Sequence, residues 1–178
     1  MTYSRLSRRN VLLGLGLLSI QGLLAACSRN ASIARAPVDF DAAATCALDG
    51  MLLGDYPGPK AQIFFGDDVR PVWYCDTVEM FSTLLRPEQV RAVSAVYTQD
   101  MALADWDLPR GHWFDARTGF YVSGSRRRGS MGPTIAGFAR EDAAIKFASA
   151  YGGNVLRFAD VTPAMVDLSG GAMHDQKM

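Results

Sequence analysis

Residues 45–60, TCALDGMLLGDYPGPK, combine two sulfur side chains with a tight turn. The thiol of Cys46 and the thioether of Met51 flank Gly50, a residue type that lets the backbone turn sharply. Both sulfurs are soft, polarizable donors, which suit cuprous copper better than calcium or magnesium. The next residues, DYPGPK, contain two prolines and predict a rigid turn beside the sulfurs. Two sulfurs alone do not make a metal site, so further soft ligands must come from elsewhere in the chain.

Other soft side chains lie at three places. Cys75 directly precedes a predicted helix, whose N-terminal dipole is expected to lower the pKa of the thiol. Met131 lies in the glycine-rich stretch GSMGP, where a core methionine would be out of place. Met173 and His174 lie close together near the end of the chain. Each of these alone has an ordinary explanation, because methionine often fills gaps in a core and a histidine in a tail is usually solvated.

The first 26 residues have the pattern of a secretory leader. Arg5, Arg8 and Arg9 precede a short apolar run, which ends at the sequence LLAAC. The run is too short for a membrane span. Small residues directly before Cys27 are typical of a bacterial lipobox, so we expect cleavage to leave Cys27 as a lipidated N-terminus. Ser28 follows it in place of an aspartate, which favours anchoring in the outer membrane, facing the periplasm.

The composition of the remaining 152 residues argues against several classes of function. The leader carries three of the 18 basic residues and none of the 18 acidic ones, so the mature chain is slightly acidic and gives no reason to expect nucleic-acid binding. Only two histidines are present, and neither a G-x-S-x-G elbow nor a phosphate-binding loop is found. The spacing of histidines and cysteines does not suit zinc. We therefore do not expect an enzyme.

Residues 41–168 predict one α+β domain built from two β-β-α-β halves, about 41–100 and 101–168. In the first half, strands 61–65 and 69–74 form a hairpin, and a helix capped by Asp76 and Glu79 ends before Pro87. A strand at 90–97 completes this half.

The second half repeats the order with weaker signals. A hairpin is predicted from strands 112–115 and 120–123 around the turn 116–119, followed by a loop over 124–133. A short run at 135–139, a helix over 140–151 and a strand at 154–158 complete it. Residues 27–40 predict a flexible tether after the lipidated cysteine, and residues 169–178 a flexible Met/His tail.

The order of these motifs resembles the NosL family of copper-binding lipoproteins, which serve the maturation of nitrous oxide reductase. The motifs that carry the resemblance are Cys46 with GM at 50–51, DYPGPK, CDTVEM from Cys75, SMG at 130–132, and the final MH. Many relatives read C-x-x-C-G-M, whereas Asp49 stands here in the place of the second cysteine.

The resemblance implies a tandem β-β-α-β fold and one Cu(I) ion as cargo. It further implies delivery of this ion, on the periplasmic side of a membrane, to the machinery that assembles the copper sites of nitrous oxide reductase. Transferred residue by residue, the family pattern assigns the metal to Cys46, Met51 and Met131, with Cys75 and His174 as further candidates.

Two other readings of the cysteines stay open at this stage. In an oxidising compartment the default for two cysteines is a structural disulfide, so the chain could be an adaptor lipoprotein without metal, stapled by a Cys46–Cys75 bond. An oxidoreductase is a poorer reading, because the two cysteines are far apart in sequence and no C-x-x-C motif exists.

Overall fold

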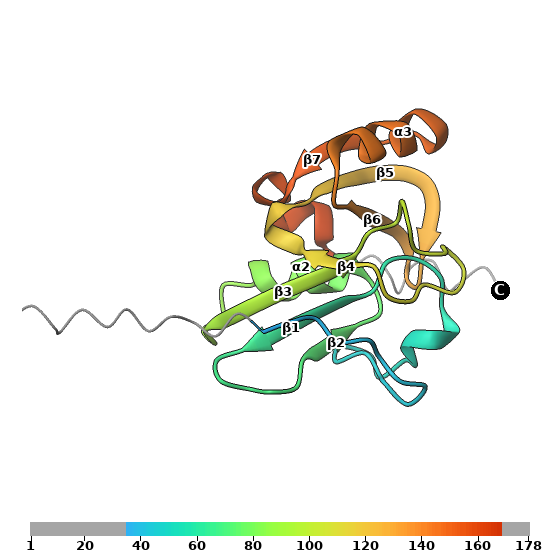
Figure 1. The fold of residues 1–178 in the computed structure, drawn as a ribbon. Coiled ribbons are helices and arrows are strands. Elements are labelled where there is room, and N and C mark those ends of the chain that lie inside the picture. Colours follow the sequence, from blue (N-terminus) through green and yellow to red (C-terminus); the bar gives the residue numbers. More distant parts are fainter. Residues whose placement is uncertain (1–34, 169–178) are drawn as a thin grey trace, which may run out of the picture. The chain divides into compact units, whose positions relative to one another are not determined.

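The computed structural model describes residues 35–168, which contain two helices and two antiparallel sheets (Figure 1). The strand order is β2-β1-β3-β4 in the first sheet and β6-β5-β7 in the second. The predicted α+β class is therefore confirmed. Short 3-10 turns connect these elements: η1 (Leu53–Asp55), η2 (Ala116–Thr118), η3 (Phe158–Asp160) and η4 (Pro163–Val166). Within residues 35–168, no helix is long and apolar enough to cross a membrane.

The first half has the predicted β-β-α-β order: β1 (Ala61–Phe65), β2 (Val72–Tyr74), α2 (Thr77–Leu85) and β3 (Val93–Gln99). β1 pairs antiparallel with β2 and β3, so it is the central strand of the half, and all five of its residues are buried. The Asp76 side chain accepts a hydrogen bond from Val78 N and begins α2, as the capping pattern predicts. The helix ends at Leu85, before Arg86 and Pro87.

The predicted hairpin over residues 112–123 is wrong. β4 (Trp113–Asp115) pairs with β3 and so extends the first sheet, whereas β5 (Phe120–Gly129) belongs to the second sheet. Between them, the Asp115 side chain accepts a hydrogen bond from Arg117 N and stabilises η2, which carries the chain from one sheet to the other. The local composition predicts the turn at residues 116–119, but strand pairing depends on distant partners that the local sequence does not reveal.

The segment 124–133 is also not the loop that the sequence predicts. β5 continues to Gly129 and pairs with β6 (Gly132–Phe138), so a two-residue turn at Ser130 and Met131 joins the two strands. Arg127 lies on β5 with its guanidinium 4.5 Å from the ring centre of Trp106. The second β-β-α-β unit is thus β5, β6, α3 (Glu141–Tyr151) and β7 (Asn154–Arg157), with β4 added to the first sheet.

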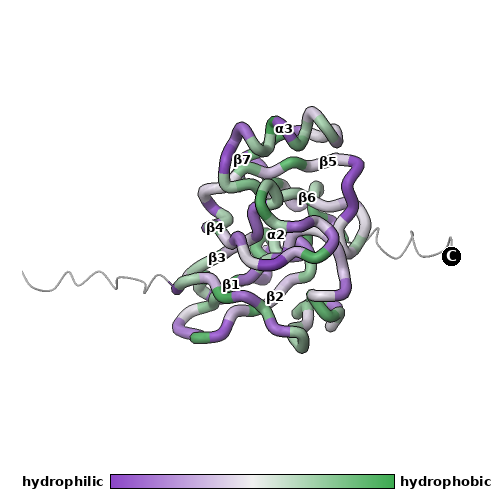
Figure 2. The backbone as a smooth tube through the Cα atoms, turned by 45° about the vertical axis from the view of Figure 1, so that its right-hand side comes forward, coloured by the Kyte–Doolittle hydropathy of each residue, from purple (hydrophilic) through white to green (hydrophobic). Residues whose placement is uncertain are grey.

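Three clusters of buried hydrophobic residues hold the two sheets and helices together. The largest joins β1, α2 and β5 through Ile63, Phe81 and Tyr121. A second lies under α3 and includes Phe138 and Phe147. Figure 2 shows hydrophobic and hydrophilic positions following one another along α3. The third cluster contains both described cysteines, together with Phe40 and Leu53.

Candidate metal centre

The loop from Cys46 to Met51 places the first thiol. Cys46 N donates a hydrogen bond to Met51 O (2.8 Å), and Gly50 N donates to Cys46 O (2.9 Å). Gly50 has φ of 77°, which only glycine adopts at low cost, so the predicted role of this residue in the turn is confirmed. The closed loop leaves Cys46 with 3% of its surface exposed.

The second thiol comes from the junction of β2 and α2. Cys75 follows the last residue of β2 and is fully buried. One Glu79 oxygen, Oε2, accepts a hydrogen bond from Cys75 N (3.1 Å) and lies 3.0 Å from Cys46 Sγ and 3.2 Å from Cys75 Sγ. Glu79 therefore reaches one residue beyond the usual capping-box partner, the backbone N–H of Asp76, and bridges the two thiols.

An exposed carboxylate completes the cluster on the solvent side. Asp49 Oδ2 lies 3.9 Å from Cys75 Sγ. One ligand atom from each of Cys46, Asp49, Cys75 and Glu79 lies within 4.8 Å of the other three. Three of these residues are buried and only Asp49 is exposed, so the cluster opens to solvent at the 46–51 loop. Two thiols that converge in this way are the donors that soft metal ions such as Cu(I) prefer.

A layer of polar groups, formed by Lys60 and Ser130, contacts Cys75 and supports the cluster. Lys60 is fully buried, and its ammonium donates to Pro57 O and Cys75 O, both at 3.1 Å. Ser130, in the β5–β6 turn, places its hydroxyl 3.1 Å from both Cys75 O and Cys75 Sγ. The predicted turn at residues 55–60 therefore acts mainly through its last residue, Lys60, which fixes the backbone beside Cys75.

Asp76 connects this layer to the second sheet. Its Oδ1 accepts hydrogen bonds from Val78 N (2.9 Å) and from the Thr134 hydroxyl (2.7 Å), while Oδ2 has no hydrogen-bond partner among the described residues. A Cβ atom on Gly129 would lie 2.0 Å from that oxygen, so the close approach of β5 to Asp76 requires glycine. The site is thus built between the two β-β-α-β units.

The protonation states in the cluster follow from these contacts. A hydrogen bond from the Cys75 thiol lowers the pKa of Cys46 to about 6, and burial opposes this shift. The same hydrogen bond and burial raise the pKa of Cys75 far above its usual range. Burial also raises the pKa of Glu79 to about 8, and the Cys46 thiolate contributes to this shift. These shifts favour a thiolate at Cys46 over one at Cys75 at neutral pH, with the Cys75 thiol donating a hydrogen bond to it.

The pKa values of the Lys60 ammonium and the Asp76 carboxyl group are also shifted. Burial lowers the pKa of Lys60 to about 8, while the nearby Asp76 carboxylate opposes that change. Burial raises the pKa of Asp76 to about 6. Both groups are charged at pH 7. The positive charge of the Lys60 ammonium therefore offsets the negative charges of the nearby Asp76 carboxylate and Cys46 thiolate.

The structure can be compared with each predicted ligand. Cys46 and Cys75 come together as free thiols, so it does not contain the disulfide of the alternative reading. The prediction that the helix dipole lowers the pKa of Cys75 is wrong, because its hydrogen bond to Cys46 and its burial dominate. Met51 joins the loop through its backbone, and Met131 lies 43% exposed beside Ser130. His174 and the lipidation site Cys27 lie outside the described residues.

Sequence reasoning missed the polar residues that surround the thiols. The capping pattern predicts Glu79 only as part of a helix cap. Its position four residues after Cys75 is nevertheless a signal, because it places the carboxylate within reach of that thiol across the first helical turn. The sequence pattern shows Lys60 only as the end of a turn motif, and Asp49 only as a departure from the family pattern. Their convergence depends on the packing of β1, β2 and the 46–51 loop, which no spacing in the sequence encodes.

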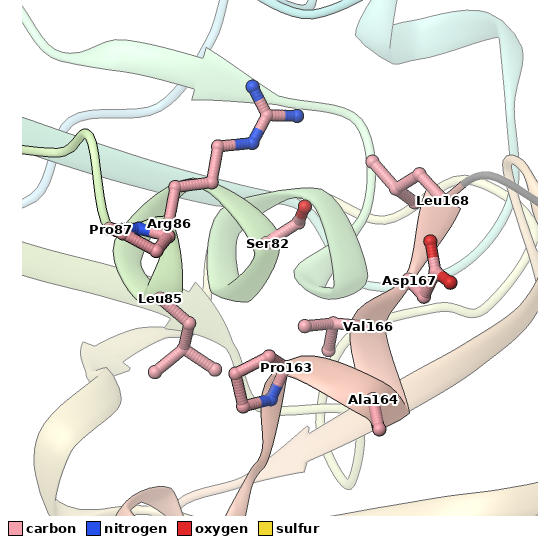
Figure 3. A pocket seen from close by; sticks show the side chains of 9 residues that line it. All are labelled: Ser82, Leu85, Arg86, Pro87, Pro163, Ala164, Val166, Asp167 and Leu168. Atoms are coloured by element: carbon pink, nitrogen blue, oxygen red, sulfur yellow. The ribbon is translucent and has the colours of Figure 1, made fainter.

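A hollow of about 530 Å³ lies beside the loop that carries Cys46, and its lining includes Phe40, Thr45 and Trp73. A groove of about 500 Å³ runs between the C-terminal half of α2 and η4, and Figure 3 shows Leu85 and Pro163 on its apolar wall. A further cavity, of about 310 Å³, is lined by Met131 and Met165. None of these three cavities is lined by Cys46, Cys75 or Glu79, so the candidate centre is a compact cluster under the 46–51 loop.

Comparisons with known proteins agree with this picture. The sequence model of the NosL family matches residues 37–166. A copper-binding lipoprotein NosL from Stutzerimonas stutzeri is 36% identical over 144 residues, which cover 78% of this chain and 75% of that protein. The protein of the same name from Achromobacter cycloclastes is 38% identical over 148 residues, 81% of this chain and 77% of the relative. The crystal structure of the copper chaperone NosL from Shewanella denitrificans is similar with a TM-score of 0.70 and 37% identity, over 73% of this chain and 98% of that one.

Proposed function

Because this chain belongs to the NosL family, we propose that it is a copper chaperone, not an enzyme, and that it carries Cu(I) on the thiols of Cys46 and Cys75. The observation that carries this proposal is the convergence of two buried, free thiols on Glu79 Oε2, at 3.0 and 3.2 Å. Thiolates select Cu(I) over hard cations such as calcium and magnesium. A preformed thiolate at Cys46 lets the ion bind without first removing that proton.

Further ligands of the ion are proposed from the sequence pattern. Met51 lies on the loop that covers Cys46, and Met131 lies on the turn whose Ser130 contacts Cys75. Both thioethers, and the imidazole of His174, could complete a soft ligand set at the solvent side of the thiols. An ion held by two thiolates with exchangeable outer ligands can be taken over by a partner that offers its own methionine or histidine.

We also propose where the protein works. The lipoprotein name of the two relatives and the lipobox before Cys27 support anchoring through a lipid on Cys27, on the periplasmic side of a membrane, more specifically the outer membrane. Anchoring would raise the effective concentration of the carrier near membrane-bound partners. The family supports delivery of copper to the machinery that assembles the copper sites of nitrous oxide reductase.

Competition for Cu(I) against a chromophoric chelator, with the thiols kept reduced, tests the copper site. We expect one ion per chain to be removed from the chelator. Substituting Cys46→Ser or Cys75→Ser should reduce the affinity by at least about 100-fold, since a ligand and not only its support is lost. Met101→Leu is the matched control, because Met101 is a buried methionine of the α3 cluster. Equal affinity of wild type and both serine variants would contradict the assigned site.

Delivery is tested separately in cells. A strain that carries the Cys46→Ser and Cys75→Ser variant is expected to produce nitrous oxide reductase with a low copper content, measured on the purified enzyme. A normal copper content, with the variant present at wild-type levels, would contradict delivery while leaving copper binding intact.

A further inference from the structure

Two valines are the most exposed large hydrophobic side chains among the described residues. Val69 is 76% exposed and Val90 is 89% exposed. Val69 lies in the loop between β1 and β2, and Val90 lies in the segment between α2 and β3. Neither side chain belongs to a buried cluster, so packing in the core does not explain why these two positions are hydrophobic.

The two segments that carry these valines are joined to each other. Asp68 and Arg91 form an ion pair at 2.8 Å, and Gly66 N donates a hydrogen bond to Ala92 O at 2.7 Å. Because Phe65 pairs with Val93, the end of β1 and the start of β3 lie at the same end of the first sheet (Figure 1). Val69 and Val90 therefore extend from one joined surface, which we call the valine end.

The chain also arrives from its N-terminal side at the valine end. The Arg35 guanidinium donates a hydrogen bond to Asp67 O, and Arg35 O accepts one from the Tyr97 hydroxyl. Arg35 is eight positions after Cys27, and a fully extended chain of that length spans at most about 29 Å. A lipid on Cys27 would thus keep Arg35, next to the valine end, within about 29 Å of the membrane surface.

The candidate copper site lies at the opposite end of the same strands. Lys60 precedes β1, Cys75 follows β2, and Gln99 ends β3, so all three lie at the end away from Gly66. From Lys60 to Gly66 the strand covers about 20 Å at about 3.3 Å per residue.

We infer that the valine end is a membrane-contacting surface, and that it turns the copper site away from the bilayer; this inference rests on the lipid anchor in the proposed function. The side chains of Val69 and Val90 enter the interfacial region of the lipid. Around them, Arg70 can contact phosphate groups, Asp68 is paired with Arg91, and Arg35 donates to the backbone of the exposed Asp67. Two small apolar side chains suffice for orientation, because the anchor already supplies the attachment.

This orientation has a consequence for copper transfer. A partner can approach the thiols from the aqueous side, where Asp49 is the exposed member of the cluster. The domain would then transfer its ion without first leaving the membrane surface.

The inference is tested with the full lipidated protein on vesicles of phosphatidylethanolamine and phosphatidylglycerol that contain brominated phospholipid. Val69→Trp and Val90→Trp each place a fluorophore at the valine end. Leu108→Trp is the matched control, since Leu108 is 69% exposed but lies in the segment after β3, beyond Gln99. The emission of the three native tryptophans is subtracted using wild type.

We expect lipid bromines to quench the two valine-end tryptophans at least about twofold more than the tryptophan at position 108. Equal quenching at all three positions, or stronger quenching at 108, would overturn the inference. Emission that shifts to shorter wavelength without lipid, as protein concentration rises, would assign the valines to contact with a second copy and would also overturn it.

Two further measurements separate this inference from the anchor and from the substitutions themselves. Failure of wild type to float with the vesicles would remove the anchor, and with it the inference, whereas flotation without selective quenching would overturn the inference alone. Hydrogen exchange of the unsubstituted protein should slow at residues 66–71 and 87–92 on vesicles, with residues 101–112 unchanged. Unchanged exchange at the first two segments would contradict membrane contact.

Discussion

The two β-β-α-β units share an order of elements but differ at the first turn of their helices. In α2 that turn is buried: Asp76 caps it, and Glu79 bridges two thiols. In α3 the corresponding turn is exposed. Its cap residue, Arg140, makes no side-chain cap hydrogen bond and instead pairs with Asp142 at 2.6 Å, with both side chains more than half exposed.

The difference shows that the repeated topology does not by itself create the candidate site. The chemistry arises where the polar first turn of a helix is covered by other parts of the chain. The 46–51 loop and the β5–β6 turn cover the start of α2, so burial raises the pKa values of Asp76 and Glu79. The start of α3 stays in water, where the same residue types are only weakly coupled.

Removing the cap of α2 should produce the largest effect on stability. Asp76→Ala leaves Val78 N and the Thr134 hydroxyl without their buried acceptor, so we expect a loss of about 3 kcal/mol in the free energy of unfolding. The measurement is chemical denaturation followed by circular dichroism. Asp142→Ala in α3 is the matched control and should leave the unfolding midpoint unchanged. Similar losses in both variants would show that burial does not distinguish the two turns.

Glu79 should matter for copper, and its counterpart on α3 should not. Glu79→Leu removes the carboxylate that contacts both thiols and Cys75 N, so we expect Cu(I) affinity to fall by about 10- to 100-fold. Glu79→Gln keeps one acceptor and one donor and should lie between wild type and the leucine variant. Competition against a chelator measures all three, with Glu141→Leu as the control. A Glu79→Leu variant that binds as tightly as wild type would remove this residue from the site.

The buried carboxylate of Asp76 should also affect the pH dependence of stability. Its pKa is about 6 in the folded protein and 3.8 in the unfolded chain, so between these values the folded state retains a proton that the unfolded state has released. Stability from this group therefore falls as pH rises through that window, by about 1 kcal/mol between about pH 5 and pH 7.5.

Asp76→Asn isolates this contribution, because the amide keeps an acceptor for Val78 N and for Thr134 but does not ionise. Glu79 has a shift of the same sign and stays in the variant, so the quantity to compare is the difference between the two pH profiles obtained from urea denaturation. Parallel profiles for wild type and variant would mean that Asp76 has an ordinary pKa in the folded protein.

The same contrast explains which features the sequence could predict. The hairpin β1–β2 and the start of α2 follow from local patterns: two runs of strand-forming residues, a Gly-Asp turn and an Asp76 cap. The pairing of β4 with β3 and the length of β5 do not, because each depends on a strand distant in sequence. Cys46 and Cys75 were predicted as ligands, but their contact with Glu79 and the shielding by Lys60 arise only when separate segments pack together.

The smallest expected effect comes from giving α3 the cap that it lacks. Arg140→Ser supplies a side-chain oxygen at the N-cap position, whereas Arg140→Ala removes the Asp142 pair without supplying an acceptor. The difference in Tm between the two variants isolates the cap, and we expect the serine variant to melt a few degrees higher. Copper affinity should be the same in both, because a cap in water does not bring thiols and a carboxylate together. A change in affinity would mean that the two helices are coupled across the β5–β6 turn, and the site would then depend on both units.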